Sequence, residues 1–269
     1  MFLGNKWAIK YFNDLIKNET LSHAYVFYGP QGVGKKSLAL NISQKLLGAL
    51  NSSPDIKIID KGGEQIYISD IRDLKNFLYL TSFGKYKVAI INNAHNLNPE
   101  ASNALLKVLE EPPGRSLTFL VTHLERALLP TIISRCQLIR FRPLGETEIF
   151  DYLVDEHKIK KEEALKAAKL ARGSLGLAID LASNFEEFKK NVSLLNELLK
   201  SGFARRFETA KEISAAPDSL KKVVKNWFIY AASLEGGEKL AKELLYLNNI
   251  ISRPQFNHRL VFENFLAGL

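Results

Sequence analysis

The sequence has very little cysteine: Cys136 is the single one among 269 residues. A single cysteine forms neither an intrachain disulfide nor a zinc site built from several cysteines, which is typical of proteins from reducing compartments. The sequence also lacks an apolar run of about 18 residues that could form a membrane helix, and residues 1–6 lack the apolar stretch of a signal peptide. We therefore expect a cytoplasmic protein that does not contact a membrane.

The overall composition is typical of a soluble globular protein with a large core, since 46% of the residues are hydrophobic and 25% are charged. The formal net charge is +8. A basic surface allows contact with nucleic acid or another polyanion, but it specifies no partner. Composition therefore leaves the function open, and the motifs have to decide it.

A loop that nearly matches the phosphate-binding P-loop follows an apolar run at residues 24–28 and precedes a segment of helical periodicity. In the pattern G-x-x-x-x-G-K-[ST], glycines turn backbone N–H groups onto phosphate oxygens, the lysine neutralises phosphate charge and the hydroxyl binds Mg²⁺. Lys36 stands at the hydroxyl position, and Ser37 is turned about 100° further round the helix. The residues predicted to bind a nucleotide here are Gly29, Gly32, Gly34, Lys35, Lys36 and Ser37. The loop keeps the means to bind phosphate, whereas its metal ligand is missing.

The strand expected at residues 88–91 ends in two amides, Asn92 and Asn93. A working P-loop ATPase has Asp and Glu there: the Asp holds Mg²⁺ and the Glu activates the attacking water. An amide has neither the charge nor the basicity for these roles, so we expect the chain to lack most of its own hydrolytic apparatus. His95 follows closely, but a lone histidine at a strand end is more often a structural hydrogen-bonding residue, and none of the histidines has metal-ligand spacing.

Apolar runs alternate with helical segments in the first half of the chain, a pattern that predicts a parallel sheet covered by helices. The expected strands are residues 24–28, 56–59, 88–91, 117–121 and 138–141. After Pro143 the strand signals stop, and successive helices are expected, beginning with residues 147–157, 161–171 and 174–182. We therefore predict an α/β P-loop domain at residues 1–142, a small three-helix domain at 143–183 and a helical C-terminal domain at 184–269.

Three strings carry a family resemblance: LSHAYVF at residues 21–27, NALLKVLEEPP at 103–113 and LPTIISRC at 129–136. They resemble the bacterial DNA polymerase III clamp-loader family of AAA+ proteins, and within it the delta-prime subunits. The resemblance spans about residues 4 to 180. It implies a subunit of a pentameric ring that opens a sliding clamp and places it on primed DNA. The implied fold is a AAA+ core with a helical lid, followed by a helical collar domain that joins the subunits.

The Ser-Arg-Cys motif of this family supplies an arginine finger to the ATP site of the neighbouring subunit, so the resemblance implies that role for Arg135. A guanidinium at a subunit boundary stabilises charge on the transferring γ-phosphoryl group. The alternative for Arg135 is a salt-bridging arginine within its own domain. Glu110 and Glu111 belong to a segment that lies near the subunit boundary in this family, and a positioning role is open for them.

Other family features are kept or lost individually. Thr122 matches the polar first-sensor position, whereas the lid arginine of the motor subunits is absent, since Gly176 or Leu177 stands there. The four-cysteine zinc module that many members carry is missing from the short segment 48–55. We therefore expect that no zinc binds and that no cofactor is required.

The resemblance implies as partners the gamma/tau ATPase subunits, the delta subunit, the sliding clamp and primed DNA within the complex. Arg72, Lys75 and Lys107 are candidate contacts to DNA phosphates. Solvated helix faces explain these three basic residues equally well.

Three functions remain open at this point. The first is a silent loader subunit, which gives Arg135 to a neighbour. Such a subunit belongs to a polymerase holoenzyme, but the chain itself has neither polymerase nor ATPase activity. The second is a subunit that keeps ATP or ADP bound without hydrolysis, which Lys35 and the glycines allow. The third is an autonomous AAA+ ATPase acting on DNA or protein, which needs a carboxylate near Mg²⁺ that these motifs do not supply.

Overall fold

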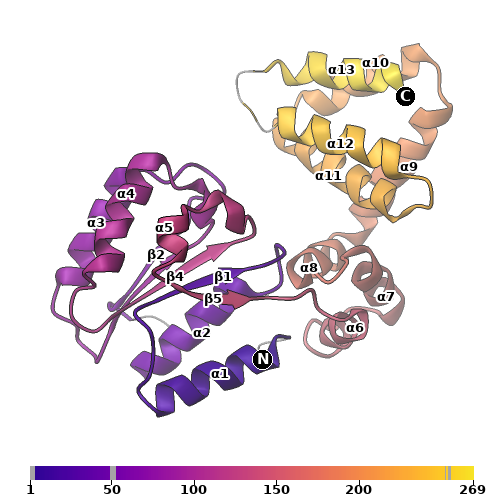
Figure 1. The fold of residues 1–269 in the computed structure, drawn as a ribbon. Helices are drawn as coiled ribbons and strands as arrows, with labels where there is room; N and C mark the ends of the chain where they lie inside the picture. Colours follow the sequence, from indigo (N-terminus) through magenta and orange to yellow (C-terminus); the bar gives the residue numbers. More distant parts are fainter. Residues whose placement is uncertain (1–3, 49–52, 252, 254–255) are drawn as a thin grey trace. The chain divides into compact units, whose positions relative to one another are not determined.

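A computed structural model describes residues 4–48, 53–251, 253 and 256–269 of the chain (Figure 1). Contacts divide the chain into two compact units. The first runs to His157 and includes Arg172–Leu177, and the second comprises Lys158–Ala171 and Ala178–Leu269. The segment 48–55, where no zinc module is expected, contains residues 49–52, which lie outside the described residues.

The first unit is built on a sheet whose strand pairs are all parallel. Within the described residues this sheet has five strands in the order β2-β3-β4-β1-β5. Their bounds are β1 Ala24–Tyr28, β2 Ile56–Ile59, β3 Lys87–Ile91, β4 Ser116–Thr122 and β5 Gln137–Arg140. Strands β3 and β4 are buried along their whole length, because helices cover both faces of a parallel sheet. The predicted α/β fold class is confirmed.

Helices of the first unit cover both faces of the sheet, apart from the last of them, which follows β5 (Figure 1). They are α1 Lys6–Lys17, α2 Lys35–Leu47, α3 Ile68–Tyr79, η1 Ala94–Asn96, α4 Pro99–Glu110, η2 Glu125–Ala127, α5 Pro130–Ile133 and α6 Glu146–Asp155. Helix α4 begins with proline after Asn98, whose Oδ1 accepts a hydrogen bond from the N–H of Ala101 at 2.8 Å. This N-cap, and a proline whose missing N–H is not needed in the first turn, explain where the helix starts.

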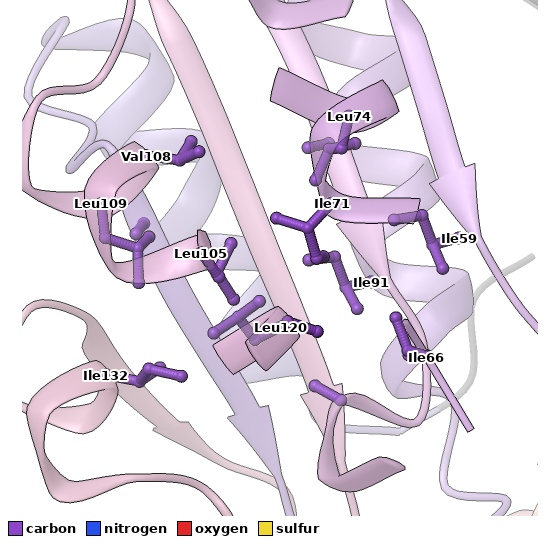
Figure 2. Packing of buried hydrophobic residues seen from close by; sticks show 14 of the residues in the cluster. Ile59, Ile66, Ile71, Leu74, Ile91, Leu105, Val108, Leu109, Leu120 and Ile132 are labelled. Carbon is purple, nitrogen blue, oxygen red and sulfur yellow. The ribbon is translucent and has the colours of Figure 1, made fainter. Parts of the chain in front are cut away.

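Each face of the sheet has its own hydrophobic core, because successive residues of a strand point to opposite faces. Figure 2 shows the core on one face, where Ile71 of α3 and Leu105 of α4 pack toward Leu120 of β4. On the other face Phe12 of α1 contacts Phe27 of β1, with ring centroids 5.5 Å apart. Packing on both faces holds the strands firmly, and with them the loops that leave their carboxyl ends.

The second unit is helical throughout its described residues. Its helices are α7 Lys161–Leu170, α8 Leu175–Ser183, α9 Phe185–Lys200, α10 Phe203–Ser214, α11 Pro217–Ser233, α12 Glu238–Ile251 and α13 His258–Gly268, of which α8 starts in the first unit. Trp227 is fully buried, its Nε1 donates to the carbonyl of Asn191 at 2.7 Å, and its ring lies 5.8 Å from that of Phe262. Because its polar N–H is satisfied, this tryptophan can anchor an apolar core.

The helical texture expected for the second half of the chain is thus confirmed, whereas the division into three domains stays a prediction. Contacts group α6 with the sheet and α7 with the C-terminal helices. No helix in the described part of the chain is both long and apolar enough to cross a bilayer.

Candidate functional site

The loop between β1 and α2 has the backbone of a phosphate-binding loop. Gly29, Gly32 and Gly34 have φ angles of +132°, +75° and +90°, which glycine adopts without steric cost. Helix α2 begins directly after them at Lys35. The free N–H groups of its first turn therefore lie at the end of the loop, an arrangement that favours an anion.

Lys35 is held against its own loop. The side chain is 6% exposed, and its ammonium donates to the carbonyl of Gly29 at 2.7 Å and to that of Pro30. Burial lowers the pKa of Lys35 to about 8, because a desolvated ammonium is disfavoured. In Lys35, the predicted phosphate-binding lysine, the hydrogen bonds to the loop carbonyls therefore offset only part of the cost of burying the ammonium.

Ser174 and the first turn of α8 close on this loop within the first unit. The N–H of Gly176 donates to the carbonyl of Gly32 at 2.9 Å, and a Cβ added to Gly32 would lie 2.1 Å from Ser174 Oγ. Ser174 Oγ also accepts from the N–H of Leu177 at 3.3 Å, which is the cap expected of a serine at a helix start. Glycine at position 32 is thus required both by its backbone angle and by its neighbour.

Lys36 does not point to a metal ligand but to a carboxylate. Its ammonium lies 2.6 Å from Asp60 Oδ2, and the same oxygen accepts from Asn92 Nδ2 at 3.1 Å. The hydrogen bond from Lys36, followed by that from Asn92, holds the pKa of Asp60 below its usual range. Sequence reasoning missed Asp60, although it directly follows a predicted strand and the carboxyl ends of parallel strands meet at one edge of a sheet.

Thr122 ends β4 on the same edge and is 1% exposed. Its Oγ1 accepts from the N–H of Leu124 at 3.0 Å and lies 3.1 Å from His95 Nδ1. The ring of His95 contacts that of His123, with centroids 4.3 Å apart. Burial, with added repulsion from His123 and Lys35, lowers the pKa of His95 to about 4. An imidazole this weakly basic is a poor proton acceptor at neutral pH, so the geometry favours the structural interpretation of His95.

A hollow of about 880 Å³ opens beside the start of the loop. Its lining includes Gly29, Arg126, Arg140 and Arg142, and Glu125 is the one carboxylate that contributes to it within the described residues. Three arginines against one glutamate make the local potential positive, which favours an anionic ligand near the loop.

The metal that accompanies a P-loop nucleotide does not fit this site. The ammonium of Lys36 stands at the hydroxyl position, and the amide of Asn92 replaces the carboxylate that would hold Mg²⁺. Magnesium requires oxygen ligands, and an ammonium supplies none. Across the described ranges, no group of three or more His, Cys, Asp and Glu side chains is placed to hold a metal ion. Ser37, the other predicted ligand of the loop, is exposed one residue further along α2.

Arg135 lies on the opposite edge of the sheet from the loop. It precedes β5, whose first residue Gln137 pairs with Tyr25 near the start of β1, whereas the loop follows the end of β1 at Tyr28. At about 3.3 Å per strand residue, this separates the two positions by some 10 Å of strand or more. Arg135 is therefore not placed to act on the P-loop of its own chain.

The guanidinium of Arg135 is oriented by its surroundings and remains accessible. Nη2 pairs with Glu110 Oε1 at 2.7 Å, Nη1 donates to the carbonyl of Thr131 at 2.9 Å, and the side chain is 36% exposed. The alternative role of Arg135 as a salt-bridging residue thus has a partner, Glu110. This glutamate is one of the two considered for positioning, and the pair is accessible to solvent.

Comparison with known sequences relates the chain to replication proteins. The matching family model is described as DNA polymerase III, delta subunit, and covers residues 49–145. The delta' subunit of Bacillus subtilis is 31% identical over 212 residues, which is 71% of this chain and 64% of the relative. The delta' subunit of Pseudomonas aeruginosa is 35% identical over 136 residues, 43% of this chain and 42% of the relative. The tau subunit of Escherichia coli is 30% identical over 215 residues, 66% of this chain and 33% of the relative. The chain therefore spans less than two thirds of the length of these relatives.

Solved structures share the fold. A DNA polymerase III gamma subunit-related protein from Thermotoga maritima aligns with a TM-score of 0.63 over 95% of this chain and 97% of that one, at 23% identity. RuvB of Thermotoga maritima, a Holliday junction branch migration motor, aligns with a TM-score of 0.54 over 71% of this chain and 65% of that one, at 19% identity. Identities this low support a common fold and leave activity open.

Proposed function

We propose that this chain belongs to the family of the DNA polymerase III delta' and gamma/tau subunits, and that it is a clamp-loader subunit of the delta' kind. In this role it takes part in placing a sliding clamp on primed DNA, does not hydrolyse ATP itself, and gives Arg135 to the ATP site of a neighbouring subunit. The observation that carries the proposal is the contrast between the two edges of the sheet: ATPase groups are replaced at one edge, while an accessible arginine is held ready at the other.

Loss of hydrolysis follows from the groups at the carboxyl edge, which is the edge of the sheet where the strands end and the P-loop leaves β1. Hydrolysis of a P-loop nucleotide needs a held divalent cation and a residue that orients the attacking water. Lys36 and Asn92 stand where the metal is bound, and Asn93 stands where a base is expected. His95, with a pKa of about 4, is a poor substitute for that base at neutral pH.

Action in trans follows from the position of Arg135. An arginine finger must reach out of its own subunit, and it works best when its guanidinium is oriented beforehand. Arg135 is remote from its own loop and partly exposed, and Glu110 and Thr131 fix its direction. These features support a finger more than a purely internal salt bridge.

The partners are proposed from the family: gamma/tau subunits as ATPases, a delta subunit, the sliding clamp and primed DNA. Arg72 and Lys107 are exposed on α3 and α4, so they remain candidates for contacts to DNA phosphates. Lys75 is half-buried, with its ammonium 5.6 Å from the ring of Tyr79. It is therefore the weakest candidate of the three.

A second candidate function is a nucleotide-binding subunit without turnover. It is favoured by Lys35, a buried ammonium whose hydrogen-bond partners among the described residues are two loop carbonyls and which would gain from a phosphate. It is a variant of the first proposal, because a bound nucleotide would stabilise the loop without changing the role of Arg135. The autonomous ATPase ranks last, because the carboxylate near the loop, Asp60, is already paired with Lys36.

The test is ATP hydrolysis by a loader reconstituted from this chain and its partner subunits of the same organism. Rates are measured with clamp and primed DNA, for the wild type and for Arg135→Ala, at equal complex assembly verified by size-exclusion chromatography. An exposed arginine of the same unit that does not line the hollow, changed in Arg115→Ala, serves as the control. We expect a large fall for Arg135→Ala alone. Equal rates for all three proteins would mean that Arg135 is structural, and robust hydrolysis by the isolated chain would refute its silent role.

A further inference from the structure

We infer that the ammonium of Lys36 takes the place of the divalent cation in this P-loop, so that a phosphorylated ligand binds to the loop without a metal ion. This goes beyond the loss of hydrolysis: it assigns Lys36 and Asp60 to a metal-free anion site. It does not depend on Arg135, so the two proposals succeed or fail separately.

The first step is the position of Lys36. It is the second residue of α2, and its side chain leaves the helix where the motif has the hydroxyl that carries the cation. Its ammonium is fixed by Asp60 at 2.6 Å. A positive charge is therefore built into the chain at the mouth of the loop, next to the site of a ligand's phosphates.

The second step is the way Asp60 is held. Its Oδ2 accepts from Lys36 and from Asn92 Nδ2, and its Oδ1 accepts from the N–H of Gly62 at 3.3 Å. The N–H of Asn92 in turn donates to the carbonyl of Ile59 at 2.8 Å, which ties the end of β3 to the end of β2. The carboxylate is thus surrounded by N–H donors on both oxygens and is anchored to two neighbouring strands.

The third step is the consequence for a cation. A divalent ion near Asp60 would have to displace the ammonium or lie beside it, and like charges repel strongly at such distances. It would also meet the N–H₂ of Asn92, which is a donor directed at the same carboxylate oxygen. The site therefore excludes Mg²⁺ and keeps two lysines, Lys35 and Lys36, to neutralise phosphate charge.

The experiment is a titration of the full-length chain with ATP by isothermal calorimetry, in excess Mg²⁺ and in excess EDTA. We expect affinities that agree within about twofold in the two conditions. A fall of about tenfold or more in EDTA, equivalent to about 1.4 kcal/mol, would overturn the inference. Absence of binding in both conditions would overturn it as well, while leaving the test of Arg135 untouched.

Variants identify the residue responsible. In Lys36→Thr we expect binding in EDTA to weaken about tenfold, whereas Lys36→Arg keeps metal-free binding. In the double variant Lys36→Thr, Asn92→Asp we expect Mg²⁺ to become a requirement, because a carboxylate and a hydroxyl again face the loop. Lys85→Thr removes an exposed lysine paired with Glu19 and is the matched control. If Lys36→Thr binds like the control in EDTA, with an unchanged melting temperature, Lys36 does not have this role.

Discussion

The two edges of the sheet in the first unit have different chemistry, although the same strands build both. At the carboxyl edge, where the P-loop leaves β1, a carboxylate is neutralised by Lys36 and two amides follow β3. At the amino edge, before β5, Arg135 is oriented by Glu110 and stays accessible. The comparison teaches that the two edges of one sheet can differ in the groups they carry without disturbing each other, because a rigid sheet lies between them.

The largest effect is expected when the group that carries the positive charge at the amino edge is changed. In Arg135→Lys the charge is kept but the planar guanidinium is lost, so contacts to two phosphate oxygens at once are lost too. We expect turnover at the neighbouring ATP site of the loader to fall by about 10²-fold. Single-turnover hydrolysis by the reconstituted complex measures this. Turnover close to that of the wild type would mean that any cation suffices there and that the geometry around Arg135 is incidental.

The carboxyl edge is predicted to matter for stability, whatever its role in catalysis. Gly32→Ala places a Cβ at a φ of +75° and 2.1 Å from Ser174 Oγ. We expect the free energy of unfolding to fall by about 2–3 kcal/mol, measured by urea denaturation followed by circular dichroism. In the control Gly62→Ala, at a φ of +63° with no atom within 4 Å, the loss should be about 1 kcal/mol. Equal losses in the two variants would show that Ser174 and the first turn of α8 do not lock the loop.

The pH dependence of ligand binding sharpens the assignment of Lys35. Its pKa is lowered to about 8 by burial, and a bound phosphate raises that pKa because it favours the charged form. ATP affinity should therefore be highest below pH 8 and decrease as the pH rises above it, by about tenfold per unit at most. Calorimetry in EDTA measures this. His95 and His123 also lie close to Lys35, but their lowered pKa values keep them neutral across this range.

In Lys35→Arg the guanidinium stays charged throughout, so the decrease should vanish. A decrease that persists in this variant would assign the titration to another group.

The smallest effect is expected for Glu110, the residue that orients Arg135. Glu110→Gln removes the charge that pairs with Arg135, while both side chains are more than a third exposed. Stability should change by less than about 1 kcal/mol, whereas turnover by the neighbouring subunit should fall about threefold because the guanidinium is less well directed. The neighbouring Glu111→Gln is the control. If both variants leave the rate unchanged, Glu110 does not position Arg135.

Much of the fold was predictable because its signals are local. Apolar runs of strand length, glycines before a helix and Asn98 with Pro99 at a helix start act over a few residues, and the structure agrees with the fold class that they predict. The P-loop residues and Thr122 were also found on one edge of the sheet, as the order of strands and loops requires. Bounds differ slightly, as for β4, which spans Ser116–Thr122 where a strand was predicted at residues 117–121.

The pairs that decide the chemistry were not predictable in the same way. Lys36 and Asp60 are 24 positions apart, and Asp60 and Asn92 are 32 apart. Asp60 and Asn92 meet because β2 lies next to β3 in the sheet, and Lys36 reaches Asp60 from the first turn of α2. No local pattern indicates either contact. The contact of His95 with Thr122 and that of Arg135 with Glu110 depend on tertiary packing for the same reason.

The sequence by itself determined which chemical groups are available: a glycine loop with Lys35, a lysine in place of a hydroxyl, amides in place of carboxylates, and a retained arginine. These are matters of side-chain identity, and no fold can restore a missing charge or hydroxyl. Only the tertiary structure decided which groups face each other. Strand order placed Asp60 beside Asn92, the packing of α2 brought Lys36 to Asp60, and the direction of β1 and β5 placed Arg135 away from its own loop. Long-range packing brings these residues together, and it is absent from any short stretch of chain.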